Sequence, residues 1–270
     1  MSSTQRVLFS LALGALASTS AHAGLTVDSA SYTYTQNFDT LAATGTANSW
    51  VNDSTIAGWS LFNSTGTAPG TYIAENGASN AGAFRSFGTT GSTDRALGDT
   101  ASGGTYYGSP LSGAVAGWIA VSFTNATGAD LSGFTLGYDG EQWRNGGNTT
   151  AQSLTLQYGI GDSFSSVTNW VTPGGSFDFT SVVNTATAAA VDGNGVGLVA
   201  GLGGSQSVSW ANGATLWVRW ADLNDVGNDH GLAIDNVSLS VASAVPEPQT
   251  YAMLLAGLAC VGFIARRRKI

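Results

Sequence analysis

The stretch Leu154-Thr155-Leu156-Gln157-Tyr158-Gly159-Ile160 places an apolar side chain at every second position. A strand turns successive side chains to opposite faces of a sheet, so this alternation is typical of a strand with one buried face. Runs with the same period, separated by Gly, Asn and Asp, occur at 32–38, 119–123, 134–138 and 216–220. We therefore predict an all-β body, an antiparallel β-sandwich of the jelly-roll type with about ten to twelve strands.

The last strand-like run of the body changes phase. Leu232 and Ile234 set one parity, whereas Val237 and Leu239 set the other. A two-residue period cannot shift in this way without a defect, so we predict a β-bulge near 235–236. The alternative is that Ile234 packs on the opposite face of its sheet.

The first 23 residues read as a secretory signal peptide. Arg6 supplies a basic start, 7–17 is apolar, and Ala21-His22-Ala23 is a small-residue cleavage site. We expect handling by the Sec translocon and signal peptidase, and a mature body over 24–244. A retained N-terminal anchor is the alternative.

The C-terminal region, 245–270, contains an uncharged apolar segment over about 250–265. As a helix it would reach about 24 Å, slightly short of the roughly 30 Å hydrocarbon core of a bilayer. The basic tail, 266–270, predicts a cytoplasmic C-terminus for this transmembrane helix. A buried core helix is the alternative.

Two prolines precede the apolar segment. Pro246 and Pro248 fix their own φ angles and push the preceding residues to extended conformations, which gives a stiff, unpaired strip. Pro246-Glu247-Pro248, the apolar segment and the following arginines together resemble the PEP-CTERM sorting signal of Gram-negative bacteria. The sorting residues are then a substrate motif: Pro246, Glu247, Pro248, Arg266, Arg267 and Arg268.

That resemblance implies recognition by an exosortase, a membrane-embedded cysteine transpeptidase-like enzyme, and cutting near the Pro-Glu-Pro motif. It also implies export linked to exopolysaccharide and biofilm. The protein would cross the inner membrane and be anchored transiently with its C-terminus in the cytoplasm. It would then reach the cell surface or the extracellular matrix.

The body is acidic and contains no lysine, and the whole chain carries a formal net charge of -8. Nucleic-acid binding needs a basic patch, and docking on anionic lipid needs clustered cations. We therefore expect no nucleic-acid partner. The only cysteine, Cys260, lies in the apolar segment, so the body has neither a disulfide nor a thiolate nucleophile.

Four patches of the body resemble a β-sandwich module of secreted bacterial proteins, which also occurs attached to extracellular nucleases and phosphoesterases. They are 38–41, 91–98, 140–144 and 229–236. The ending 233–239 is similar to the last strand of carbohydrate-binding and adhesion jelly rolls. Where that pattern has a second acid, this chain has Asn236.

A dense run of oxygen-bearing side chains over 222–230 suggests a metal site. Calcium takes six to eight oxygen ligands. The predicted cofactor is therefore at most a structural calcium, with the candidate ligands Asp222, Asp225, Asp229 and Asp235. The alternative is a polar turn whose Asn and Asp side chains bond to their own backbone.

Two groups of residues are candidates for ligand binding. Glu141, Trp143 and Arg144 belong to the predicted loop 140–144, where the alternative is that Glu141 pairs with Arg144 and Trp143 packs over them. Trp118 and Trp217 lie opposite the core faces of their strands, so their flat rings could receive sugar rings. Packing under a covering loop is the alternative for these two tryptophans.

The pattern predicts no catalytic residue and no enzyme. Glu75 and Glu141 are the only glutamates of the body, and nothing fixes a carboxylate pair on one cleft. We expect an exported surface or matrix protein with a structural, biofilm or exopolysaccharide-associated role. The alternatives are a carbohydrate-binding or adhesion module with a structural calcium and, third, a secreted hydrolase.

Overall fold

The structure is a computed structural model that describes residues 24–243 and 253–260. The predicted signal peptide, the Pro-Glu-Pro motif and the terminal arginines lie outside these residues. Residues 253–260, inside the predicted transmembrane segment, form a helix. Among the helices of the described ranges, none combines the length and the apolar character needed to cross a membrane.

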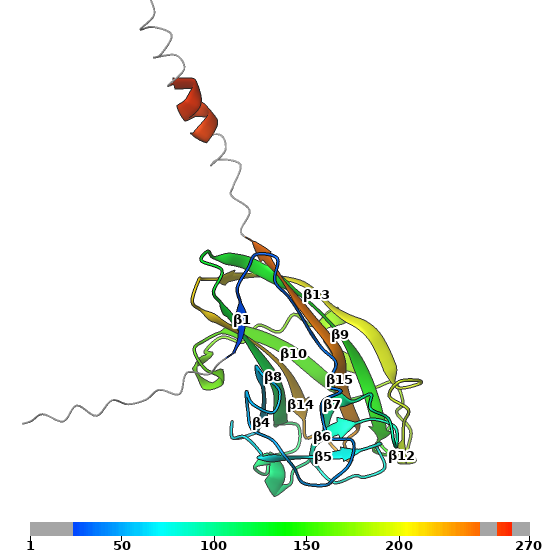
Figure 1. Cartoon of the computed structure of the whole chain (residues 1–270). Coiled ribbons are helices and arrows are strands. Elements are labelled where there is room, and N and C mark those ends of the chain that lie inside the picture. The colour runs from blue at the N-terminus through cyan, green and yellow to red at the C-terminus, as the bar shows by residue number, and fades with distance from the viewer. Residues whose placement is uncertain (1–23, 244–252, 261–270) are drawn as a thin grey trace, which may run out of the picture.

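The body contains two sheets that face each other (Figure 1). The six-stranded sheet has the order β1-β8-β14-β10-β11, and β4 also pairs with β8. Its strands are β1 (Leu25–Val27), β4 (Trp59–Asn63), β8 (Val115–Asn125), β10 (Ser153–Ile160), β11 (Phe179–Thr180) and β14 (Thr215–Leu223).

The nine-stranded sheet has the order β12-β9-β15-β7-β6-β5-β3, with β13 also on β9 and β2 also on β15. Three 3-10 helices, η1 (Thr105–Tyr107), η2 (Phe164–Ser166) and η3 (Gly175–Phe177), lie in the connections. The strands are β2 (Thr33–Gln36), β3 (Asn48–Ser49), β5 (Thr71–Glu75), β6 (Ala83–Phe87), β7 (Ala96–Thr100), β9 (Leu131–Asn145), β12 (Ala189–Ala190), β13 (Leu198–Trp210) and β15 (Gly231–Ser243).

This arrangement confirms the β-sandwich. The long strands β8, β9 and β10 alternate between the two sheets, as do β13, β14 and β15. The jelly-roll form stays a prediction. Pairing is antiparallel except for two pairs, β1 with β8 and β5 with β6, which are parallel. The purely antiparallel expectation is wrong there, because neither pair is joined by the tight hairpin that imposes antiparallel pairing.

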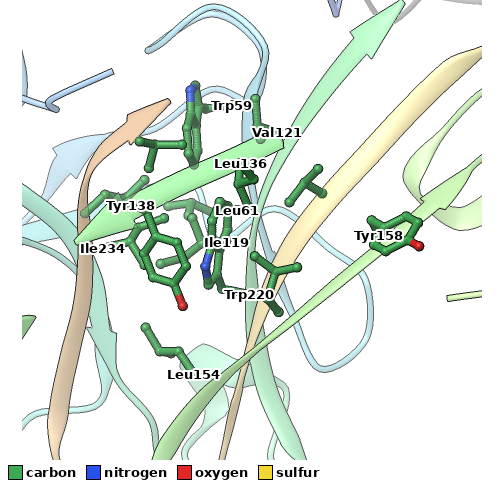
Figure 2. Close-up of a cluster of buried hydrophobic side chains, with 14 of the residues drawn as sticks. Trp59, Leu61, Ile119, Val121, Leu136, Tyr138, Leu154, Tyr158, Trp220 and Ile234 are labelled. Carbon is green, nitrogen blue, oxygen red and sulfur yellow. The ribbon is translucent and has the colours of Figure 1, made fainter. Parts of the chain in front are cut away.

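The core fills the space between the sheets (Figure 2). Leu154, Leu156 and Tyr158 are buried, as the alternation predicts. Trp59 of β4 stacks on Trp220 of β14 with ring centroids 5.9 Å apart, and Tyr138 of β9 meets Trp220 edge-on at 5.4 Å. These contacts join the inner faces of both sheets in one large cluster, and two smaller clusters around Trp143 and Trp217 are separate from it.

The bulge in β15 is confirmed. The register against β9 shifts between Asp235 and Ser238, and Asn236 has a φ of 48°. A positive φ lets the chain gain one residue, so the parity changes. Ile234 and Val237 are both fully buried in the same core, so the alternative of opposite-face packing is wrong.

Candidate functional site

The outward face of the six-stranded sheet carries an aromatic row. On β8 and β14 the inward positions are filled by aliphatic side chains, Phe123 and Trp220, so Trp118, Trp217 and Arg219 turn outward. The strand register places Arg219 opposite Ala120. It also places Phe62 of β4 opposite Trp118.

The segment 161–171 folds over this row. Its far end is fixed by a bridge in which Tyr158 and Val171 exchange backbone hydrogen bonds of 3.0 and 2.8 Å. Close approach depends on Gly159, because a Cβ there would clash with the side chain of Val167. The Ser163 N–H donates to the Ser166 hydroxyl at 2.8 Å and stabilises the start of η2. The segment is thus held on the sheet by the turn at Ser163, by the bridge to Tyr158 and by the lack of a side chain at Gly159.

Phe164 of η2 joins the aromatic side chains together. Its ring stacks on Phe62 with centroids 4.0 Å apart and an interplanar angle of 18°. It also meets Trp118 at 5.7 Å, Trp170 at 5.5 Å and Trp217 at 5.8 Å. Rings at these separations attract one another in edge-on and offset geometries. The result is a preformed aromatic cluster drawn from β4, β8, β14 and the covering segment 161–171.

The two predicted outward tryptophans have different fates. Trp217 is fully buried under the segment and donates its indole N–H to the Gly161 carbonyl at 3.0 Å. For Trp217 the covering-loop alternative is therefore confirmed and the exposed interpretation is wrong. Trp118 stays partly exposed and lines a recess of about 650 Å³.

The recess combines aromatic and polar walls. Its apolar lining includes Phe62, Trp118, Phe164 and Trp170, while Asn, Ser and Thr side chains provide polar groups around them. Small-molecule sites commonly pair apolar surface with a few placed polar groups. Volume and lining therefore suit one ring of a small polar molecule or one unit of a polymer.

Arg219 lies against the aromatic rings of the recess. Its Cζ is 3.6 Å from the ring centre of Trp170, 5.1 Å from that of Trp118 and 5.4 Å from that of Phe164. Its Nε donates to Gln157 Oε1 at 2.8 Å. Burial lowers the pKa of Arg219 to about 10, so the side chain stays cationic at neutral pH.

The other candidate group lies on the outward face of the nine-stranded sheet and is closed. Residues 140–144 are the end of β9 and not a loop. Glu141, Trp143 and Arg144 are buried, with exposed fractions of 2%, 1% and 8%. Trp143 stacks on Phe87 with an interplanar angle of 2°, and the backbone at Gly193 closes over its ring. The predicted loop at 140–144 is therefore wrong, and these three side chains are not open to a ligand.

The expected pairing of Glu141 with Arg144 is also wrong. The Trp143 indole N–H donates to Glu141 Oε2 at 2.7 Å. Arg144 donates instead to the carbonyls of Gly77 and Ala78, each at 3.0 Å. Burial raises the pKa of Glu141 to about 7, although the indole hydrogen bond opposes the shift.

The four calcium candidates do not converge. Asp222 is buried beside Asp99. Burial is the main cause that raises the pKa of Asp222, and the charge of Asp99 is the second. The charges of Asp225 and Asp229 also raise the pKa of Asp222, so these carboxyls are near one another. Asp235 lies apart from them, beside Glu141. Within residues 24–243 and 253–260, no three His, Cys, Asp or Glu side chains are grouped to hold a metal ion.

The two glutamates of the body do not form a carboxylate pair across a cleft. Glu75 is engaged in an ion pair with buried Arg85 at 2.6 Å, and Glu141 is sealed under Trp143. His230 is fully buried, and its Nδ1 accepts the Gly146 N–H at 2.9 Å. These groups serve the packing of the nine-stranded sheet.

Sequence reasoning missed most of the recess. Phe62, Phe164, Trp170 and Arg219 were not among the predicted site residues. The parity of β14 already placed Arg219 on the same face as Trp217, which was a usable signal. Phe62 comes from β4, and Phe164 and Trp170 come from the covering segment 161–171, so only the folded chain brings them to Trp118.

Comparisons with known proteins identify a motif in the C-terminal region. Residues 244–269 match the family model described as the PEP-CTERM protein-sorting motif, so the chain carries this motif. The motif implies export and processing by an exosortase. Among the curated proteins, none matches the chain at a significant level.

The body has a weak likeness to several solved structures. One is the CBM22-1 xylan-binding domain of Xyn10C from Paenibacillus barcinonensis, with 10% identity, a TM-score of 0.38, and coverage of 80% of this chain and 99% of that one. Another is the K3 cleaved adhesin domain of Lys-gingipain from Porphyromonas gingivalis w83, with 10% identity, a TM-score of 0.36, and coverage of 68% and 92%. At these TM-scores neither likeness bears on the ligand or the site of this chain.

Proposed function

We propose that this chain is an exported exosortase substrate whose body binds polysaccharide at the cell surface or in the extracellular matrix. The PEP-CTERM motif supports the route. In this proposal the signal peptide directs Sec export from a Gram-negative cytoplasm, and the apolar segment 250–265 holds the chain with its C-terminus inside until processing. The released body then associates with exopolysaccharide or biofilm.

The observation that carries the binding role is the recess on the six-stranded sheet. Sugar rings have apolar C–H faces, which pack on flat aromatic rings such as Trp118, and hydroxyls, which need hydrogen-bonding partners. The recess offers both, with partly exposed aromatic rings beside polar side chains such as Thr65 and Ser165. The cluster around Phe164 is preformed, which lowers the entropy lost on binding.

We propose a non-catalytic role for the body. This is supported by the use of both glutamates in internal contacts and by the absence of aspartate and glutamate from the described lining of the recess. General acid–base work on a glycosidic bond needs two carboxyl groups that reach the substrate. The recess can therefore hold a sugar without cleaving it.

Binding of the full-length chain in non-ionic detergent to a panel of polysaccharides tests the body's role. We expect binding that weakens about tenfold or more in Trp118→Ala and is largely kept in Trp118→Phe, because phenylalanine preserves a stacking surface. Tyr32→Ala, outside the recess lining, is the control and should bind normally. Failure to bind any polysaccharide would leave the purely structural role.

Processing in cells tests the route independently. Replacing Pro246, Glu247 and Pro248 by Ala should leave an unprocessed, membrane-held form, because the Pro-Glu-Pro part of the sorting motif is lost. Immunoblots of membrane and extracellular fractions report the result, and Gln249→Ala serves as the neighbouring control. Normal release of the triple variant would refute the sorting role.

A further inference from the structure

The recess holds a cation without an acidic neighbour. Among the described residues that line it, none is an aspartate or a glutamate. Burial alone accounts for the lowered pKa of Arg219, with no charged group contributing. Partly desolvated charges in proteins are normally paired, because losing water is costly unless another charge replaces it. Among the described residues that line the recess, Arg219 therefore lacks the anionic partner that a partly buried cation normally has.

The geometry leaves the hydrogen-bonding edge of Arg219 available. Trp170 packs on the face of the guanidinium group, and the Nε donor is used by Gln157. Within the described part of the chain, neither Nη group of Arg219 donates a hydrogen bond. A guanidinium held by its face presents its remaining in-plane N–H groups as a fork, which matches an oxyanion.

The other arginines of the body are committed to structure. Arg85 pairs with Glu75, Arg95 donates to the Ser86 hydroxyl and carbonyl, and Arg144 donates to loop carbonyls. All three are buried, whereas Arg219 is partly exposed at the recess. In a chain of net charge -8, an anion is repelled by most of the surface and attracted here.

We infer that the recess takes an acidic sugar residue, a hexose bearing a carboxylate or a sulfate ester. The sugar ring lies against Trp118 and its neighbours, and the anionic group accepts hydrogen bonds from the Nη groups of Arg219. This inference rests on the proposed saccharide binding and adds the class of sugar. It gives an acidic protein a single cationic contact for an acidic polysaccharide.

Calorimetric titration of the full-length chain in non-ionic detergent tests the inference. The probes are oligogalacturonate, neutral oligogalactose of equal length, and a sulfated oligogalactose. We expect at least one acidic probe to bind about tenfold or more tightly than the neutral probe, and to weaken as salt is raised. The two acidic arms distinguish a carboxylate from a sulfate ester.

Three variants locate the effect. Arg219→Met keeps the apolar stem and should reduce acidic binding about tenfold or more, to the level of the neutral probe. Arg219→Lys keeps the charge but loses the fork, so an intermediate loss is expected. Thr89→Glu, at an exposed position outside the recess lining, makes the same change in net charge as Arg219→Met and should bind as the parent chain does.

The outcomes separate the two proposals. Equal affinity for acidic and neutral probes, unchanged in Arg219→Met, would overturn the acidic-sugar inference while saccharide binding stands. Failure of every probe to bind would overturn both. If Arg219→Met does not fold, the salt dependence of the parent chain and the Arg219→Lys titration decide, and salt-independent binding of the acidic probes would contradict the inference.

Discussion

The outward faces of the two sheets can be compared directly, because each carries a tryptophan close to an arginine. These are Trp143 and Arg144 on β9, and Trp118 on β8 with Arg219 on β14. Around Trp143 the Phe87 ring, the Glu141 carboxyl and the backbone at Gly193 fill the space, and the face is sealed. Around Trp118 the covering segment leaves a recess of about 650 Å³. The same side-chain types thus yield a closed packing unit and an open one.

The difference lies in what the cation contacts. Arg144 donates from Nη1 to the carbonyls of Gly77 and Ala78, so it ties the loop at 77–78 to β9. Arg219 is held by rings and by one amide oxygen. Backbone partners make an arginine structural, whereas aromatic partners leave its hydrogen-bonding edge for another molecule.

The sharpest way to break the comparison is to truncate each tryptophan. Trp143→Ala should lower the free energy of unfolding by about 3–5 kcal/mol, because it removes a fully enclosed ring and the partner of a buried carboxyl. Trp118→Ala should lower it by only about 1 kcal/mol, since one side of that ring faces the recess.

Urea denaturation of the two variants measures both values. Trp143→Phe is the matched control and should recover part of the loss, because it keeps the stack on Phe87. Equal losses at the two positions would show that the recess is as much a part of the packing as the sealed face.

The next difference between the two faces concerns how the stability depends on pH. The pKa of Glu141 is raised from an ordinary 4.5 to about 7, and that of Asp235 from 3.8 to about 8, mainly by burial. A raised folded-state pKa means that the stability is fully present below the unfolded pKa and is lost as pH rises through the folded one. Arg219, with a pKa of about 10, does not titrate in this range.

We therefore expect the melting temperature to be higher at pH 5 than at pH 8.5, by roughly 4–8 °C. The buried pair Asp99 and Asp222 contributes with the same sign, because burial raises both of their pKa values. Glu141→Gln should reduce the change of melting temperature with pH. At pH 8.5 its melting temperature should be higher than that of the parent chain. A melting temperature that rises with pH would contradict this assignment.

Calcium is expected to have the smallest effect. Asp222, Asp225 and Asp229 are near one another, but the Asp222 carboxyl interacts with the Asp99 carboxyl. We expect millimolar calcium or a chelator at pH 8 to shift the melting temperature by less than about 1 °C. A larger rise, lost in Asp229→Asn but kept in Asp235→Asn, would instead place a structural calcium at this cluster.

Several features of the fold could be read from the sequence because they are local. The two-residue period marks β10 and β14 correctly, and the parity change between Ile234 and Val237 locates the bulge of β15. The sorting motif is likewise contiguous, over 244–269. The parallel pairing of β1 with β8 could not be read in this way, because it joins segments far apart in the chain.

The candidate site was only half predictable for the same reason. Parity alone turns Trp118, Trp217 and Trp143 outward, and to that extent the sequence determines the protein's outer faces. Whether an outward ring is sealed or left open depends on the segments that cross it. Phe164 meets Phe62, and Gly193 meets Trp143, only after distant parts of the chain have packed. Local periodicity therefore determined the strands, and long-range packing alone decided which face keeps a recess.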